Sequence, residues 1–275
     1  MAGQYSGRIN VIRDMTATKP NLIIRLAQDE RDLRAAQRLR YEVFIEELGG
    51  DGAMVDHVNR LEIDEFDPWF DHLLLIDPSR DAAQLQDVVG VYRLLTSDKA
   101  EQLGRYYSES EYDLTPLKAT GRKLLELGRS CVHKDHRGGA AMLLLWNALA
   151  DYVLERDIEV MFGTASFHGT NPETMRQALS YLHYNHLAPQ DIRVTALEDH
   201  RQKMDLLSEA EVDRREALAS MPPLIKAYLR LGGFVGDGAW IDHDFNTTDV
   251  CLLMDTGRMS GKHRDFYTRK SGSGQ

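Results

Sequence analysis

The segment KDHRGGAA at residues 134–141 places two glycines and several basic side chains immediately before an apolar stretch. Small residues let the backbone approach a ligand closely, and a helix N-terminus offers unpaired N–H groups to a phosphate. The chain has neither a G-x-G-x-x-G fingerprint nor the Gly-Lys-Ser/Thr of a P-loop. The segment therefore indicates either a phosphate-binding turn or an ordinary tight connection between a strand and a helix.

A single acid, Glu126, interrupts the apolar stretch LLELGRSCV at residues 124–132, which has the character of a buried strand. A carboxylate in such a strand needs a partner or takes a raised pKa, and beside a site it can act as a general base. Strand alternation places Glu126 and Gly128 on one face and Arg129 on the other. The alternative role for Glu126 is a structural ion pair with a nearby arginine.

Arg40 shares a helical face with apolar residues that include Phe44. A guanidinium beside an apolar stripe either extends its charge to solvent or binds an anion. Asp64 and Asp67 lie in the aromatic-rich segment IDEFDPWFD. Two acids there either hold a cationic substrate or are solvated turn residues.

The sequence argues against a zinc site and against a serine-hydrolase site, because the motifs that these sites require are missing. The histidine pairs His133/His136 and His183/His186 lack the H-E-x-x-H pattern, and no cysteine pair supports a zinc site. No G-x-S-x-G elbow is present, which argues against a serine hydrolase. We therefore expect no metal site.

The periodicity of apolar positions predicts the elements that must hold these residues. Helices are expected to begin at Asp29, near residue 140 and after Asn171-Pro172, and the charged stretch 198–220 is expected to form an exposed helix. The polar segment 99–118 has the character of an excursion over a site. Strands are predicted at residues 21–27, 72–76, 88–95, 124–132, 159–166, 239–242 and 249–254. This order predicts a mixed α/β fold built on one sheet.

Composition narrows the possible classes of function. The 275 residues carry a formal net charge of −10, which argues against a general nucleic-acid binder. Only two cysteines are present, so a disulfide framework is not expected and a reducing compartment is favoured. No apolar run approaches the roughly 20 residues that cross a bilayer, and the N-terminal segment lacks the apolar core of a signal peptide. We expect a cytoplasmic protein, with peripheral contact at the inner face of the membrane left open.

Taken together, the element order and several motifs resemble a known fold family. The order of strand, helix, three strands, glycine-bearing turn and helix resembles the Gcn5-related N-acetyltransferase (GNAT) fold. The motifs R-Y-E-V-F (40–44), D-E-F-D (64–67), V-Y-R (91–93) and E-L-G-R (126–129) resemble the acyl-homoserine-lactone synthases of that fold. The chain lacks the tryptophan that those synthases carry shortly after the first helix.

A resemblance to the L-ornithine Nα-acyltransferases of bacterial ornithine-lipid synthesis covers nearly the whole chain. It rests on LELGRSCVHKDHRGG, FGTASFHGTNP and the block PPLIKAYLRLGGFVGDGAWIDHDFNTTDVCLL. It implies a GNAT-type mixed central sheet flanked by helices, with a C-terminal helical and strand extension. The implied domain covers residues 21–255, between a flexible arm (1–20) and a basic tail (256–275).

The reaction implied by this resemblance moves a 3-hydroxy fatty acyl group from acyl carrier protein to the α-amino group of L-ornithine. The product would be lyso-ornithine lipid, and no permanently bound cofactor is implied beyond the donor's acyl-phosphopantetheine. Glu126 and Arg129 are expected to be catalytic, with Glu126 as the base. Expected substrate-binding residues are Arg40, Phe44, Asp64, Asp67, Arg93, Ser166 and His168. Expected phosphopantetheine-binding residues are Val132, His136, Arg137, Gly138, Gly139 and Ala141.

Several alternatives stay open at this point. The three arginines at positions 40, 93 and 129 either bind the substrate carboxylate or pair with the acids. Asp64 and Asp67 would meet the ornithine ammonium, a charge that a glutamine acceptor lacks. Other open functions are lactone synthesis, use of coenzyme A as donor, and a non-catalytic module that binds lipid or carrier protein. The basic tail would meet the carrier protein or anionic lipid, or would be solvated.

Overall fold

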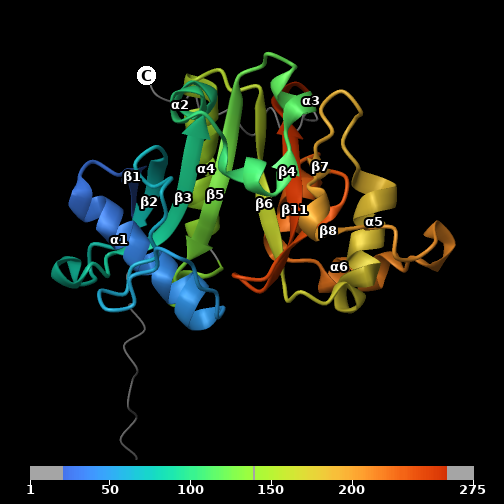
Figure 1. The fold of residues 1–275 in the computed structure, drawn as a ribbon. Coiled ribbons are helices and arrows are strands. Elements are labelled where there is room, and N and C mark those ends of the chain that lie inside the picture. Colours follow the sequence, from blue (N-terminus) through green and yellow to red (C-terminus); the bar gives the residue numbers. More distant parts are fainter. Residues whose placement is uncertain (1–20, 139, 259–275) are drawn as a thin grey trace, which may run out of the picture.

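The computed structural model describes residues 21–138 and 140–258. Its main feature is a nine-stranded mixed sheet in the order β1-β2-β3-β5-β6-β11-β10-β8, with β9 beside β11 (Figure 1). The strands are β1 (Ile23–Leu26), β2 (Asp71–Ile76), β3 (Val88–Thr96), β5 (Leu124–Val132), β6 (Val160–His168), β8 (Arg201–Gln202), β9 (Phe234–Val235), β10 (Ala239–Asp242) and β11 (Thr247–Asp255). Strands β4 (Tyr112–Asp113) and β7 (Thr195–Ala196) form a second, two-stranded sheet. The predicted arm 1–20, Gly139 and residues 259–275 of the predicted tail lie outside the described residues.

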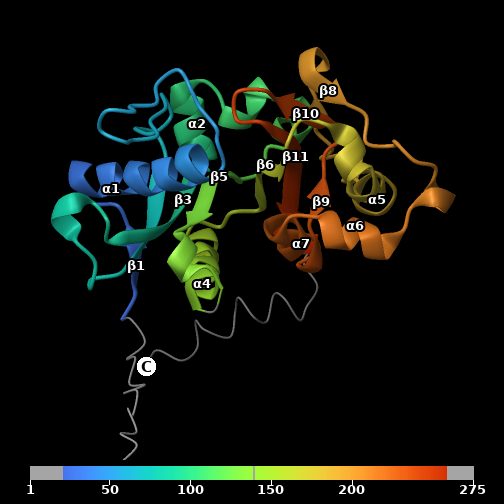
Figure 2. The ribbon, with the colours of Figure 1, turned by 90° about the horizontal axis from the view of Figure 1, so that it is seen from below.

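Helices cover both faces of the main sheet. The helices are α1 (Glu30–Arg40), α2 (Ser97–Leu103), α3 (Thr115–Lys118), α4 (Ala140–Glu155), α5 (Arg176–His186), α6 (Arg214–Ser220) and α7 (Pro223–Arg230). Figure 2 shows α1 and α2 on one face, and α4 and α7 on the other. A π-helical segment, Tyr41–Glu47, continues α1.

Local sequence signals explain where the first helix and its packing face lie. Asp29 caps α1 by accepting a hydrogen bond from the backbone N–H of Asp32, which satisfies an otherwise unpaired donor. Ala36 and Leu39 of α1 then pack against the sheet in one apolar cluster. The opposite face buries Leu145 and Leu149 of α4 in a second, larger cluster. The sheet is therefore an apolar layer enclosed from both sides.

The centre of the sheet opens between two neighbouring strands. Strands β5 and β6 run parallel, and their pairing covers only residues 124–126 and 160–162. Just beyond, Gly163 lies so close to β5 that a Cβ atom there would stand 2.1 Å from the carbonyl oxygen of Leu127. No other residue type fits this approach, and past it the two strands have no paired residues. The divergence leaves a gap in the middle of the sheet.

Strand β5 also carries a bulge in its pairing with β3. Arg129 and Ser130 together stand opposite Tyr92, because the register shifts between the pairs Val91–Cys131 and Arg93–Gly128. Arg129 has a φ of 48°, which is uncommon for a residue with a side chain. An extra residue breaks the alternation of strand faces from this point on.

One predicted element is wrong. Residues 198–220 do not form a single helix: they form a 3₁₀ turn, the short strand β8, a second 3₁₀ turn and finally α6. Side chains that bond to nearby backbone divide the stretch. Ser208 and Glu211 form a reciprocal capping box, and Asp213 accepts from the N–H groups of Arg215 and Glu216. High charge and helix propensity are overridden by these local caps.

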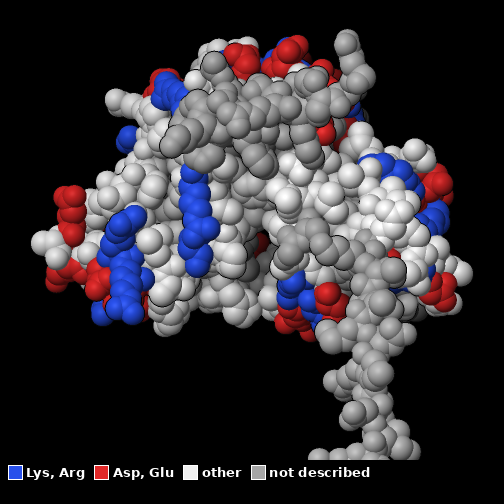
Figure 3. Space-filling model, turned by 180° about the vertical axis from the view of Figure 1, so that it is seen from behind, with Lys and Arg blue, Asp and Glu red and all other residues white. Residues whose placement is uncertain are grey.

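The predicted strands otherwise appear at or near their expected positions, and β10 matches its predicted range of 239–242. Seen from behind, the molecule shows a small hollow near its centre that is bordered mainly by uncharged side chains (Figure 3). An acidic side chain is visible inside that hollow. Among the described residues, every helix is too short or too polar to cross a bilayer.

Candidate active site

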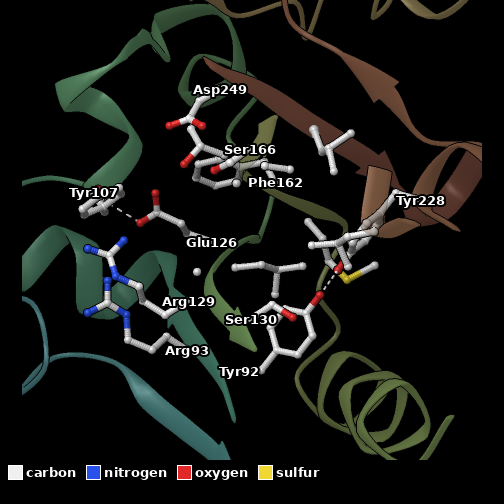
Figure 4. Close-up of a pocket in the computed structure, with 18 of the residues that line it drawn as sticks. Tyr92, Arg93, Tyr107, Glu126, Arg129, Ser130, Phe162, Ser166, Tyr228 and Asp249 are labelled. Atoms are coloured by element: carbon white, nitrogen blue, oxygen red, sulfur yellow. Dashed lines mark hydrogen bonds between the residues drawn. The ribbon is translucent and has the colours of Figure 1, made fainter. Parts of the chain in front are cut away.

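A cavity of about 260 Å³ occupies the gap between the diverging strands. Its walls come from β3, β5, β6 and β11, with α7 closing one side. Figure 4 shows Glu126 between Arg129 and the pair Ser166–Asp249. Tyr92 and Tyr228 lie in another part of the wall, near apolar side chains. The cavity thus has a polar region around Glu126 and an apolar region toward α7.

Glu126 is the buried carboxylate at the centre of the polar region, with 1% of its surface exposed. The backbone N–H groups of Tyr107 and Ser108 donate to its two oxygens at 2.9 and 2.6 Å. Burial raises the pKa of Glu126, although these two hydrogen bonds favour the charged form. The predicted excursion 99–118 therefore contacts the site directly. A carboxylate with a raised pKa inside a cavity is suited to accept a proton.

Arg40 lies behind the cavity wall, fully buried in a network of acids. Its guanidinium forms ion pairs with Glu62 and Asp67, and one nitrogen also donates to the backbone carbonyl of Glu62 at 2.6 Å. Burial alone would raise the pKa of Glu62, but Arg40 and Arg129 hold it at about 2. Of its two predicted roles, Arg40 takes the structural pairing with acids.

Arg93 lines the cavity and keeps part of its hydrogen-bonding capacity free. Its Nη1 atom donates to Asp64 at 2.6 Å and to Asp67 at 3.0 Å. Its Nε and Nη2 atoms are buried and have no hydrogen-bond partner among the described residues. The guanidinium also lies over the ring of Phe70, 4.6 Å from its centroid. Arg93 thus combines a structural ion pair with donors that remain open to a ligand.

Arg129 lies on the same side of β5 as Glu126, so the prediction that it faces away is wrong. The β5 bulge reverses the alternation and brings its guanidinium over the rings of Tyr107 and Phe245, 5.0 Å from each centroid. Its Nε atom pairs with Glu62 at 3.1 Å. Arg129 therefore contributes positive charge to the cavity wall.

Asp64 and Asp67 were expected to meet a substrate ammonium, yet both pair with arginines. Asp64 bonds Arg93 and lies 3.5 Å from Arg129, and Asp67 bonds Arg40. Neither acid lines the cavity. Their charge is already balanced within this network.

A second group of acids lies on the other side of the cavity, and two of its three members line it. We call Glu111, Asp242 and Asp249 the acid wall. All three are buried, and their carboxylate oxygens lie within 4.8 Å of one another, which is close enough to hold a metal ion. Burial and the neighbouring acids raise the pKa of Asp249 to about 6 and that of Glu111 well above its usual range. An acid inside the apolar strand β11 is the same signal that marked Glu126, but sequence reasoning did not use it for Asp249.

The glycine-bearing turn has acidic partners for both of its predicted phosphate-binding side chains. Arg137 pairs with Glu47 and donates through Nε to the carbonyl of Val132 at 2.9 Å. His136 lies 3.0 Å from a carboxylate oxygen of Asp77. Gly138 has a φ of 89°, as a tight turn before α4 requires. The turn connects β5 to α4 as predicted, and its phosphate contacts stay a prediction.

The remaining predicted residues divide between the cavity and other environments. Phe44 and Ser166 line the cavity, and Ser166 hydrogen-bonds the carboxylate of Asp249. His168 is exposed at the end of β6 and does not line it. Val132 and Ala141 are buried in the apolar cluster under α4.

Sequence reasoning missed the backbone contacts from Tyr107 and Ser108 to Glu126. It also missed Glu62, which bridges Arg40 and Arg129. Backbone donors leave no signature in residue types, whereas Glu62 is one acid among many in a polar stretch.

Comparison with known proteins identifies the family. A family described as "Acetyltransferase (GNAT) domain" matches residues 39–147. An L-ornithine N(alpha)-acyltransferase of Rhodobacter capsulatus is 62% identical over 93% of this chain and 98% of its own length. One of Brucella abortus is 42% identical over 90% of this chain and 89% of its own length. The chain belongs to this acyltransferase family. It is an N-acyltransferase, and the expected GNAT-type fold is confirmed.

A solved N-acyl amino acid synthase from uncultured soil microbes overlaps 88% of this chain and 95% of its own, with a TM-score of 0.49 and 11% identity.

Proposed function

We propose that the protein transfers a fatty acyl group from a carrier thioester to the α-amino group of L-ornithine. The observation that carries this proposal is the position of Glu126, a buried base candidate in a cavity between unpaired arginine donors and a wall of acids. The names of the relatives in the family support ornithine as the acceptor. The product is an N-acylated ornithine with a free α-carboxylate.

Glu126 removes the proton that makes the α-amino group unreactive. An α-ammonium carries no lone pair, so it must lose a proton before it attacks a thioester. Glu126 accepts this proton, directly or through one water, and the nitrogen adds to the thioester carbonyl carbon. The tetrahedral intermediate then collapses and the carbon–sulfur bond breaks. The nitrogen gives up its remaining excess proton, which passes to the leaving thiolate, so that a neutral amide and a thiol are formed. Beyond Glu126, the β5 backbone has no β6 partner, and its N–H groups supply donors for the oxyanion.

Arg93 orients the acceptor through its α-carboxylate. The free Nε and Nη2 donors lie on one edge of the guanidinium, which matches the two oxygens of a carboxylate. The acyl chain lies in the apolar region, against side chains such as Met161, Leu252 and Met254. These two contacts bring the amine and the thioester together beside Glu126.

The donor we propose is a 3-hydroxyacyl group on acyl carrier protein. The turn before α4 holds the single phosphate of the phosphopantetheine arm, with Gly138 and the start of the helix as its cradle. For this, Arg137 exchanges its exposed ion pair with Glu47 for the phosphate.

The test is a mass-spectrometric assay of purified protein with 3-hydroxyacyl carrier protein or 3-hydroxyacyl coenzyme A as donor. Ornithine, glutamine, lysine and adenosyl-methionine are offered separately as acceptors. We expect N-acylornithine from the carrier-protein donor. Acylated glutamine in its place, a lactone, or no product with any pairing would refute the proposed acceptor. Faster reaction with coenzyme A would refute the proposed donor alone.

A further inference from the structure

The acid wall is a set of buried carboxyl groups with no ion-pair partner in the part of the chain that the structure describes. Glu111, Asp242 and Asp249 are 2%, 8% and 4% exposed. Among the described residues, no Lys, Arg or His forms an ion pair with any of them. Arg129 acts on Glu111 and Asp249 at longer range, but it is itself paired with Glu62. Buried carboxylates are costly unless they are paired, so this group favours a cation that comes from outside the chain.

The wall contains oxygens without a hydrogen-bond donor, and one of them belongs to a residue that lines the cavity. Oδ1 of Asp249 and Oε2 of Glu111 are buried and accept no hydrogen bond from residues 21–138 or 140–258. Asp249 lines the cavity, together with Asp242. Figure 4 shows the carboxylate of Asp249 on the side of Glu126 that lies away from Arg93. Orphaned acceptors of this kind are rare in native proteins and indicate a missing donor.

We propose that the acid wall binds the side-chain ammonium of the acceptor and thereby selects a diamino acid. This inference rests on the proposed function, because it places the acceptor's amine at Glu126. The polar region then presents three charged side chains in the same order as the α-carboxylate, the α-amine and the terminal ammonium of ornithine. Arg93 meets the α-carboxylate, Glu126 meets the α-amine, and Asp249 meets the terminal ammonium. Asp64 and Asp67 do not compete for the ammonium, because arginines already balance them.

The test compares ornithine with norvaline, which has the same carbon chain without the terminal amine. Asp249→Asn is isosteric and removes one charge from the wall. Losing one partner of a buried charge pair costs at least about 2 kcal/mol, so kcat/KM for ornithine should fall about 30-fold or more. The value for norvaline should change less than about threefold, so the ratio between the two substrates collapses. Asp151→Asn, on the exposed face of α4, is the charge-matched control and should leave the ratio unchanged.

Two results would overturn the inference. One is an equal loss of kcat/KM for both substrates in Asp249→Asn, which would mark Asp249 as structural. The other is an unchanged ratio in both Asp249→Asn and Glu111→Gln. If circular dichroism shows that Asp249→Asn does not fold, Glu111→Gln replaces it in the comparison of ornithine with norvaline.

Calorimetric titration separates this inference from the proposed function. We expect wild-type protein to bind ornithine more tightly than norvaline, and Asp249→Asn to bind both equally. If wild type prefers ornithine in binding but acylates no amino acid, the proposed function fails and the ammonium site stands. Asp249-dependent binding of Mg²⁺ or Ca²⁺ with no preference for ornithine would overturn the ammonium site in favour of a metal site.

Discussion

Replacing Asp249 with asparagine should stabilise the protein at neutral pH and not in acid. Burial and the neighbouring acids raise the pKa of Asp249 from 3.8 to about 6. The folded protein therefore holds this proton more tightly than the unfolded chain does. The resulting stability is complete below pH 4 and is lost as the pH rises through 6. Asparagine is neutral at every pH, so the variant does not lose unfolding free energy in this way as the pH rises.

The shift of about two pKa units sets the size of the effect. At about 1.4 kcal/mol per unit, the wild-type protein forfeits about 3 kcal/mol of unfolding free energy once the pH is well above 6. Part of this is already lost at pH 4.5, because the unfolded carboxyl group ionises there. Between pH 4.5 and pH 7.5 the variant should gain about 2 kcal/mol relative to wild type.

Urea denaturation at these two pH values, followed by circular dichroism, measures the difference. Asp151→Asn on the exposed face of α4 controls for the change in net charge, and its difference from wild type should not grow with pH. A constant offset for Asp249→Asn at both pH values would show that Asp249 ionises as freely in the folded protein as in the unfolded chain. If the difference in unfolding free energy between the variant and wild type shrinks toward neutral pH, the pKa of Asp249 is lowered on folding and not raised.

Three further substitutions test other parts of the site. Glu126→Gln should lower kcat by about 10²- to 10⁴-fold in the mass-spectrometric assay, with an unchanged circular dichroism spectrum; a loss below tenfold would exclude Glu126 as the base. Gly163→Ala should cost about 1–3 kcal/mol in urea denaturation, because its Cβ would meet the carbonyl of Leu127, and wild-type stability would show that the two strands separate freely. Arg40→Met should cost about 3–5 kcal/mol by the same measurement, because it removes one arginine partner from each of two buried carboxylates; a neutral effect would mean that Arg129 and Arg93 balance Glu62 and Asp67 without it.

The sequence predicts most of the fold because the relevant signals are local. Asp29 and Asn171 mark helix or 3₁₀ starts through their own side chains. The alternation and length of apolar runs locate the main strands, including β10 and β11. The stretch 198–220 fails because short-range caps outweigh the charge pattern that favours one long helix.

The candidate site is less accessible to sequence reasoning because it depends on contacts between distant segments. The acid wall joins Glu111 to two residues more than 120 positions later, and residue spacing carries no trace of that. The β5 bulge at Arg129 changes the face of a side chain through a single extra residue. Glu126 was found because an acid inside an apolar strand is anomalous on its own.

Because β5 and β6 diverge, the residues that line the cavity come from separate segments of the chain. Glu126 and Arg129 belong to β5, at one edge of the opening. Asp242 and Asp249 belong to β10 and β11, beyond β6 at the other edge, and Glu111 lies in a connecting segment. The contacts that we propose for acceptor selection and for proton removal therefore lie on separate segments of the chain. Replacing the β10–β11 hairpin by one of different sequence should therefore change which amino acid is acylated. Glu126, on β5, would keep its position.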